Sequence, residues 1–385
     1  MSSPERPVRI AILTEIPAPF RTPLFNVLAE RDDIELDVFF LAERDPVRPH
    51  YRLFPDEMRF RWQVLPGREL VRGGRWVVLS RGVARRLLRL RPGVVVVGGW
   101  SQPAFWVALV AARLLRAPLV AWVESTARDA RSGGGALERA KRAMIARCAG
   151  FLVPGRASQE YLESLGVPAE RIEIAPNAVD VSIFRDAVAA ARAAVGRDGL
   201  RARLGVPPEG CLVLAVGRLA PEKGIDVLLA AARTLETAGS AVQVAVVGGG
   251  PEEAALRAAA PACVRFTGPL GRDELVPWYA AADVFALPSR SEQWGMVLNE
   301  AAAAALPIVA GDAAGAAWSL VDDGVSGFRV PSGDAPALAQ ALAALAADPA
   351  LRERAGARSA ALGAEHSAEA WAAGVARLAR KLAAR

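Results

Sequence analysis

The sequence predicts an α/β protein made of two successive doubly wound domains, each with a parallel sheet. The chain has 385 residues, which exceeds the size at which one hydrophobic core usually splits into two. Short apolar runs bounded by Gly and Pro alternate with helical patterns, as expected of strands that are buried on both faces. This alternation starts again after residue 210, so we expect two βα arrays rather than one.

The first array covers the amino-terminal half of the chain. The apolar runs predict strands at 8–13, 36–41, 94–97, 118–123, 150–153 and 171–174. Helical periodicity predicts helices between them at 23–30, 77–90, 103–115, 137–148 and 158–165.

The second array has the same design. We expect strands at 211–216, 242–247, 264–267, 284–286, 307–310 and 327–330. Helices are predicted at 224–237, 252–259, 272–281, 295–304 and 335–346, with two more in the tail. The stretch 186–210 between the arrays is helix-prone, but its Gly196, Gly199 and Pro207–Pro208 are typical of a linker.

Composition excludes several classes of protein. Apolar residues make up 52% and charged residues 23%, so disorder and fibrous repeats are excluded. The net charge of +6 is too small to require nucleic acid as a partner. The charge is unevenly distributed, with +10 over residues 1–205 and −4 over the rest, which indicates that the first half meets something anionic. Only three basic residues are lysines, so part of this arginine content is compositional bias.

The cysteines and the amino-terminal segment indicate a reducing compartment. Cys148, Cys211 and Cys263 are widely spaced and predict buried thiols rather than a zinc cluster or disulfides. The first residues lack an apolar signal core, and the most apolar helical stretch, 104–115, is too short to span a bilayer. We expect a cytoplasmic protein, with a peripheral position at the inner membrane face left open. His50 and His366 are expected at the surface.

One strand-to-helix turn has the composition of a phosphate site. Gly217 permits a tight turn after the strand at 211–216, and Arg218 and Lys223 follow it. Backbone N–H groups at such a turn point at an anion, and two cations there suit a diphosphate. A solvated helix start in which Glu222 pairs with Lys223 explains these residues equally well.

Two further motifs follow in the second array. A glycine turn at 248–250, which includes Gly249, follows a strand, although such turns are also common without a ligand. Farther along, Glu292 and Glu300 are separated by seven residues, with Gly295, Met296 and Val297 between them. Glu292 could then meet a sugar hydroxyl and Glu300 a ribose diol, while the backbone at 295–297 offers N–H donors. An exposed helical carboxylate is the alternative for Glu300.

Together these motifs resemble the donor-binding domain of the retaining family-four glycosyltransferases. The family's motifs occur here in the same order, over about residues 150–335. They read VGRLAPEKG from 216, VVGGGP from 246, FTG from 266, ADVFALPS from 282, EQWGMVLNE from 292 and VDDGVSGF from 321. The resemblance implies the GT-B fold, two facing Rossmann-like domains with a carboxy-terminal crossover helix. We expect domains at 1–195 for the acceptor and 196–365 for the donor, with 366–385 returning to the first domain.

The resemblance also implies roles for individual residues. Arg218 and Lys223 would hold the diphosphate, with Gly217 and Gly249 beside it, and Glu300 would bind the ribose. Glu292 would bind the transferred sugar, and Leu270 would lie near the base. The family needs no metal or other cofactor, and we expect a UDP- or GDP-sugar as co-substrate. The leaving phosphate would take the acceptor's proton after front-face attack.

The first half departs from the common family pattern. Its first βα loop lacks the usual Gly-Gly pair and carries Arg21, which either contacts the donor or acceptor or merely flanks the following helix. The usual histidine is absent, and Glu124 and Thr126 stand near its place. Glu124 could contact a sugar or relay a proton, or it could pair with Arg128. Arg21, Glu124 and Thr126 are the expected acceptor-binding residues.

The segment 44–91 carries 13 arginines and four acidic residues, interleaved with aromatic side chains. It is either a docking patch for anionic lipid or a lipid-linked acceptor, or ordinary solvated surface. We therefore expect a retaining, metal-independent hexosyltransferase of polysaccharide or glycoconjugate biosynthesis, acting on a glycan, lipid-linked or small-molecule acceptor. The alternatives are an epimerase or phosphorylase on the same architecture, and a sugar-nucleotide- or glycan-binding module without activity.

Overall fold

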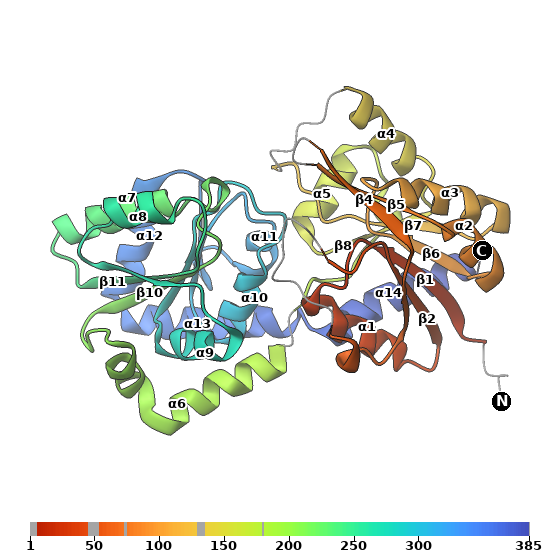
Figure 1. The fold of residues 1–385 in the computed structure, drawn as a ribbon. Helices are drawn as coiled ribbons and strands as arrows, with labels where there is room; N and C mark the ends of the chain where they lie inside the picture. Colours follow the sequence, from red (N-terminus) through yellow and green to blue (C-terminus); the bar gives the residue numbers. More distant parts are fainter. Residues whose placement is uncertain (1–5, 45–53, 73–74, 129–134, 179–180, 385) are drawn as a thin grey trace. The chain divides into compact units, whose positions relative to one another are not determined.

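The computed structural model describes residues 6–44, 54–72, 75–128, 135–178 and 181–384 (Figure 1). Contacts divide the chain into two compact units. The first contains residues 1–125, 131–178 and 368–385, and the second contains 126–130 and 179–367. Each unit is a parallel sheet with helices on both faces, so the predicted α/β class with two doubly wound arrays is confirmed.

The first unit is built on a seven-stranded parallel sheet in the order β3-β2-β1-β6-β7-β8-β9. Its strands are β1 (Val8–Thr14), β2 (Ile34–Phe40), β3 (Arg61–Val64), β6 (Val94–Val97), β7 (Leu119–Trp122), β8 (Gly150–Val153) and β9 (Ile172–Ile174). Four of these strands are buried over nearly their whole length, which explains their continuous apolar runs.

Helices cover both faces of this sheet. One face carries α1 (Thr22–Ala29) and α14 (Ala368–Ala383), whose Trp371 packs edge-on against Phe25 with 65° between the ring planes. The other face carries α2 (Val83–Leu90), α3 (Pro103–Leu115), α4 (Gly135–Ile145) and α5 (Arg156–Ser164). An antiparallel hairpin, β4 (Gly67–Arg72) and β5 (Arg75–Ser80), contacts α3 on this second face (Figure 1).

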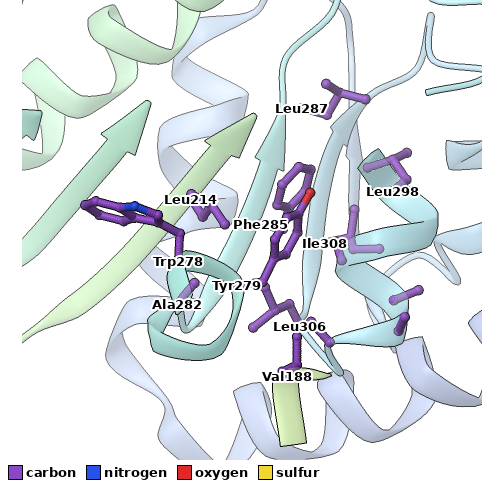
Figure 2. Close-up of a cluster of buried hydrophobic side chains, with 14 of the residues drawn as sticks. Val188, Leu214, Trp278, Tyr279, Ala282, Phe285, Leu287, Leu298, Leu306 and Ile308 are labelled. Atoms are coloured by element: carbon purple, nitrogen blue, oxygen red, sulfur yellow. The ribbon is translucent and has the colours of Figure 1, made fainter. Parts of the chain in front are cut away.

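The second unit has a six-stranded parallel sheet in the order β12-β11-β10-β13-β14-β15. The strands are β10 (Cys211–Val216), β11 (Val242–Val247), β12 (Val264–Gly268), β13 (Val284–Leu287), β14 (Ile308–Gly311) and β15 (Gly327–Val330). One face is covered by α7 (Ile225–Thr237), α8 (Glu253–Ala259) and α12 (Ala335–Ala347). The other carries α6 (Val181–Leu204), α9 (Arg272–Ala281), α10 (Met296–Ala303), α11 (Ala317–Leu320) and α13 (Pro349–Ala364). On this face the Tyr279 ring stacks on Phe285 at 5.6 Å (Figure 2).

The stretch 186–210 is helical over most of its length, as its helix-prone sequence indicated, but the prediction of a linker there is wrong. Residues 181–204 form α6, which bends at Gly196 and packs along α9. Arg201 is 4% exposed; its guanidinium pairs with the buried Asp283 and donates to the carbonyl oxygens of Ala281 and Pro208. The Asp283 carboxylate also accepts from the Leu212 amide at 2.7 Å and from Arg197 at 2.8 Å. This buried clamp fixes α6 to the second unit.

The helix expected at 77–90 is also wrong in its first part. Residues 75–80 form β5, and α2 begins only at Val83, because Gly82 turns the chain with φ +78°. Strands β3 and β4, which precede it, were not predicted. The prediction of surface histidines is wrong for His366, which is buried against Trp294, with Nδ1 2.9 Å from the Leu362 oxygen. His50 lies outside the described residues.

The cysteines are free thiols in the structure. Cys148 and Cys211 are buried and Cys263 is half-buried. Burial raises the pKa of Cys148 and of Cys211 to about 12, so neither is a thiolate at neutral pH.

Candidate functional site

The candidate donor site lies where the strand order of the second sheet reverses. From β10, one neighbour is β11 and the other is β13, so the turns that follow β10 and β13 leave the sheet side by side. Ligands of doubly wound sheets bind at the carboxyl ends of the strands at this point. Gly217, Arg218 and Lys223 follow β10, while Glu292 and Gly295 follow β13. The topology therefore brings the two predicted halves of the site to one edge.

The turn after β10 packs directly against the glycine turn after β11. The amides of Gly217 and Leu219 donate to the carbonyl oxygens of Val247 and Gly249 at 3.0 and 2.9 Å. A Cβ at Gly248 would lie 1.9 Å from the Gly217 oxygen, and one at Gly250 would lie 2.3 Å from the Leu219 oxygen. Two of these glycines are thus required by backbone packing, independently of any ligand. Gly249 has room for a Cβ, 3.4 Å from the Glu253 carboxylate and 3.5 Å from Pro269.

Lys223 and Glu292 form an ion pair across the site. Lys223 lies in the short turn Pro221–Lys223 before α7, and Glu292 lies in the loop before α10. Both side chains are about four-fifths buried, so solvent screens the pair less than a surface pair. The expected alternative, a pair between Glu222 and Lys223, is wrong: Glu222 instead faces Arg218 at 4.0 Å, with both half-exposed.

Arg290 holds the two loops together, and it was not predicted. Its guanidinium binds both carboxylate oxygens of Asp226 at 2.6 Å. The hydrogen bond from Arg290 holds the pKa of Asp226 below its ordinary value. The backbone amide of Arg290 also donates to the Glu222 oxygen at 2.8 Å. Gly224 permits this approach, because a Cβ there would lie 2.3 Å from the Pro288 oxygen.

The segment 295–300 opens α10. Gly295 has φ +99° and precedes Met296, so the first amides of the helix have no partner inside the helix. Met296 and Val297 are half-buried. Glu300 lies farther along α10, where its carboxylate accepts from the Tyr279 hydroxyl at 2.7 Å. Leu270 packs against the hydrophobic cluster between the second sheet and helices α6, α9 and α10, part of which is drawn in Figure 2.

Burial raises the pKa of Glu300, although the hydrogen bond from Tyr279 and the charge of Arg272 act in the opposite direction. Burial likewise raises the pKa of Tyr279 well above 10, and the Glu300 charge adds to the effect. The Tyr279 hydroxyl therefore stays protonated and donates to Glu300.

We expect this raised pKa to make part of the stability depend on pH. Folded Glu300 holds its proton more tightly than the unfolded chain, so its contribution is fully present below its ordinary value of 4.5 and is lost as the pH rises through the folded pKa. The melting temperature of the wild type should therefore fall relative to that of Glu300→Gln between pH 4.5 and 8. Glu353→Gln, at an exposed helical position, is the matched control and should show no such divergence. Parallel curves for all three proteins would contradict the raised pKa.

In the first unit, Arg21 and Glu124 form the core of a polar cluster. Arg21 follows β1 and Glu124 follows β7; they pair at 3.0 Å. Arg21 also donates to the Thr14 hydroxyl at 2.6 Å and lies 4.4 Å from the centre of the Trp122 ring. Asn177 donates to the same Glu124 oxygen at 3.2 Å.

Arg21 directly precedes α1, as expected of a residue that flanks the helix, but its side chain makes no hydrogen bond that caps α1. The alternative pairing of Glu124 with Arg128 is wrong, because Arg128 contacts Asp312, donating to its carbonyl oxygen at 3.0 Å. Thr126 is buried and belongs to the second unit.

A second polar group stands at the strand-order reversal of the first sheet, between β1 and β6, and it was not predicted. Glu15, directly after β1, accepts from the Ser101 hydroxyl and the Gln102 amide at 3.0 Å each. Gln102 is buried and accepts from the Val78 amide, so it anchors the Glu15 carboxylate. A hollow of about 350 Å³ lies close by, at the ends of β2 and β3, and is lined in part by Leu41, Glu43 and Val78.

The described residues contain neither a candidate metal site nor a candidate membrane span. No group of three or more His, Cys, Asp or Glu side chains is placed to hold a metal ion in the part of the chain that the structure describes. Over the same residues, no helix has the length and hydropathy needed to cross a bilayer.

The chain matches two family models. The model described as "Glycosyltransferase Family 4" matches residues 25–183, and the model described as "Glycosyl transferases group 1" matches residues 210–348.

Named relatives agree with these models. A D-inositol 3-phosphate glycosyltransferase from Streptomyces bingchenggensis is 30% identical over 407 aligned positions, covering 94% of this chain and 86% of the relative. A protein of the same name from Thermomonospora curvata is 36% identical over 211 positions, covering 51% of this chain. That match spans only 48% of the relative's own length.

Solved structures share the fold. Anabaena Alr3699/HepE in complex with UDP-glucose has a TM-score of 0.71 at 20% identity, covering 98% of this chain and 100% of that one. Sucrose-phosphate synthase from Thermosynechococcus elongatus has a TM-score of 0.68 at 20% identity, covering 98% and 99%. These likenesses establish the predicted GT-B fold.

Proposed function

The chain belongs to the group 1, family 4 glycosyltransferases, and from this premise we propose that it transfers a sugar from a nucleotide-diphosphate sugar, with retention of configuration and without a metal. The observation that carries the proposal is the Lys223–Glu292 pair, which stands at the strand-order reversal of the second sheet. A binding site for an activated sugar needs a cation for the diphosphate and an acceptor for sugar hydroxyls, and this pair supplies both.

The bond changes follow from these groups. The C1–O bond to the diphosphate breaks, and the acceptor oxygen bonds to C1 from the same face. The acceptor's proton passes to an oxygen of the leaving phosphate, so no protein base is required. Lys223 and Arg218 stabilise the charge that develops on the leaving diphosphate. The backbone amides of 295–297 add donors at the start of α10.

The ion pair also positions both partners before the donor arrives. Bound diphosphate would replace Glu292 as the partner of the Lys223 ammonium. The Glu292 carboxylate would then be free to accept hydrogen bonds from the sugar. Tyr279 would orient Glu300 toward the ribose, while Gly249 and Leu270 would lie beside the nucleotide.

The acceptor would use the carboxyl edge of the first sheet. Arg21, Glu124 and Glu15 stand there with fixed partners. We propose a glycan, lipid-linked or small-molecule hydroxyl as acceptor, in polysaccharide or glycoconjugate biosynthesis. UDP- and GDP-sugars are the favoured donors, and the structure of the Anabaena neighbour contains UDP-glucose.

A thermal-shift panel of UDP, GDP, dTDP and ADP tests the donor site. A nucleotide at 100 times its Kd stabilises the folded protein by about 2.7 kcal/mol, so one of the four should raise the melting temperature of the wild type. Arg218→Ala and Glu300→Ala should lose most of this shift. Their matched controls are Arg354→Ala and Glu353→Ala, at exposed positions on α13, and both should keep it.

The outcomes separate the proposal from its alternative. No shift with any nucleotide would contradict the donor site. A shift without sugar transfer, tested with the corresponding nucleotide sugars and a set of glycan acceptors, would favour a binding module. The anomeric proton coupling of the product, measured by NMR, tests retention: an inverted product would overturn that part of the proposal.

A further inference from the structure

One long segment of the first unit contains no acidic residue. Between Glu69 and Glu124 the sequence has nine arginines and neither lysine, aspartate nor glutamate. The segment includes the second half of β4 and all of β5, α2 and α3. A run of 54 residues with a charge of +9 is unusual in a chain whose total charge is only +6. The segment therefore presents one sign of charge wherever it reaches the surface.

These elements form one layer of the unit. Val83 and Leu87 of α2, Phe105 and Leu109 of α3, and Val78 of β5 all pack into the hydrophobic cluster on one face of the sheet. The opposite face is covered by α1 and α14. Figure 1 shows α2, α3 and the hairpin together on their side of the sheet. Side chains on the outer surface of this layer therefore share one side of the unit.

That outer surface is rich in exposed apolar side chains. On α3, Val107, Val110 and Leu114 are 40%, 59% and 71% exposed. Their spacing of three and four residues places them in one line along the helix. Exposed apolar side chains elsewhere on the outer surface are Leu70 and Leu79 of the hairpin and Leu88 of α2. Exposed apolar patches of this kind mark interaction surfaces.

The arginines of this layer are available for a partner. Arg85 and Arg89 of α2 and Arg113 of α3 are exposed. Among the residues that the structure describes, none of the three forms an ion pair. In contrast, three aromatic residues of the basic segment 44–91 are turned inward: Phe60 is buried, and Trp62 and Trp76 pack against the cores, whereas Phe54 is 45% exposed. Tyr51 lies outside the described residues.

We propose that the outer surface of α2, α3 and the β4–β5 hairpin docks the protein on an anionic lipid bilayer. Exposed valine and leucine side chains can enter the interface between headgroups and acyl chains. The arginines around them attract anionic headgroups. A nucleic acid would use the charge but would leave the line of aliphatic side chains on α3 in water. This docking does not depend on the identity of the donor or acceptor.

Co-sedimentation with vesicles tests the proposal. The wild type should bind vesicles of phosphatidylglycerol and phosphatidylcholine, and should bind pure phosphatidylcholine vesicles at least tenfold more weakly. Val110→Gln/Leu114→Gln should weaken binding to the mixed vesicles at least tenfold, because two apolar side chains leave the interface. Arg85→Gln/Arg89→Gln/Arg113→Gln should weaken binding by about fivefold per arginine and reduce its salt dependence.

The matched control is Ile183→Gln/Val325→Gln, which alters apolar side chains of the second unit that are 56% and 51% exposed. This variant should bind vesicles as the wild type does. Equal loss in the control, or no vesicle binding by the wild type, would overturn the proposal. Salt-dependent binding to an RNA oligonucleotide that Val110→Gln/Leu114→Gln leaves unchanged, without vesicle binding, would assign the charge to nucleic acid instead. The assay needs no donor and no turnover, so its outcome is separate from that of the transferase assay.

Discussion

Lys223→Met should lower kcat by about 10²–10³-fold, the effect of removing one group that stabilises charge in a transition state. Lys223 is the only lysine of the second unit, and its ammonium is held at the strand-order reversal by Glu292. Methionine keeps the length of the side chain and removes the charge that would face the leaving diphosphate. The measurement is the rate at which nucleotide is released during transfer, with the nucleotide sugar that corresponds to the nucleotide that stabilises the wild type.

Two controls separate this loss from misfolding. Lys381→Met removes a lysine on α14 in the first unit and should leave kcat unchanged. Lys223→Met also leaves the Glu292 carboxylate without its cationic partner. The double variant Lys223→Met/Glu292→Gln should therefore recover part of any lost stability, but it should not recover activity. A Lys223→Met enzyme within threefold of the wild-type kcat would show that the diphosphate is held elsewhere.

Arg201→Met should lower the free energy of unfolding by about 3–5 kcal/mol, the cost of removing the buried partner of a buried carboxylate, because the exposed Arg197 is then the only cation paired with Asp283 among the described residues. Asp283 is 6% exposed, so its carboxylate cannot recover solvation when the Arg201 guanidinium is removed. The same substitution also removes the hydrogen bonds that tie α6 to the carbonyl oxygens of Ala281 and Pro208. Urea unfolding followed by circular dichroism measures the change.

Arg197→Met is the matched control for this clamp. Arg197 binds the other oxygen of Asp283 but is 44% exposed, and the cost should stay within about 1 kcal/mol. Arg201→Met/Asp283→Asn removes the stranded charge while keeping an acceptor for the Leu212 amide, so it should regain much of the loss. Equal effects of the two arginine substitutions would mean that burial does not set the strength of this clamp.

The sheets were predictable because a strand buried on both faces must be apolar throughout. Val94–Val97 and Val284–Leu287 lie close to the predicted runs for this reason. Strand β3 and the β4–β5 hairpin were missed because arginines lie among their apolar residues. In addition, β3 lies at the edge of its sheet and is not buried on both sides. For example, Arg61 is exposed and Trp62 half-buried, and so short a strand offers too few residues for an alternating pattern. Helix α6 was interpreted as a linker, although its sequence is helix-prone, because the charged side chains that hold it to the second unit show no periodicity.

The donor motifs were predictable, but their partners were not. Glycine and charge spacing indicated Lys223 and Glu292 separately, and the direct pair between them appears only once β10 and β13 are neighbours. Tyr279 and Glu300 lie 21 positions apart on different helices, and Arg290 and Asp226 lie 64 apart. Contacts over such separations depend on the packing of whole elements, which local sequence patterns do not encode.

The close packing of the glycine turn has a consequence for engineering donor preference. In random libraries at positions 248 and 250, most variants would carry a steric clash, since any Cβ there meets the main chain of the turn after β10. Position 249 is different, because its Cβ would make only ordinary contacts with Glu253 and Pro269. Under the proposed function, a small side chain introduced there would lie beside the nucleotide while leaving the scaffold intact. Of the three glycines, therefore, only the middle one is open to directed evolution.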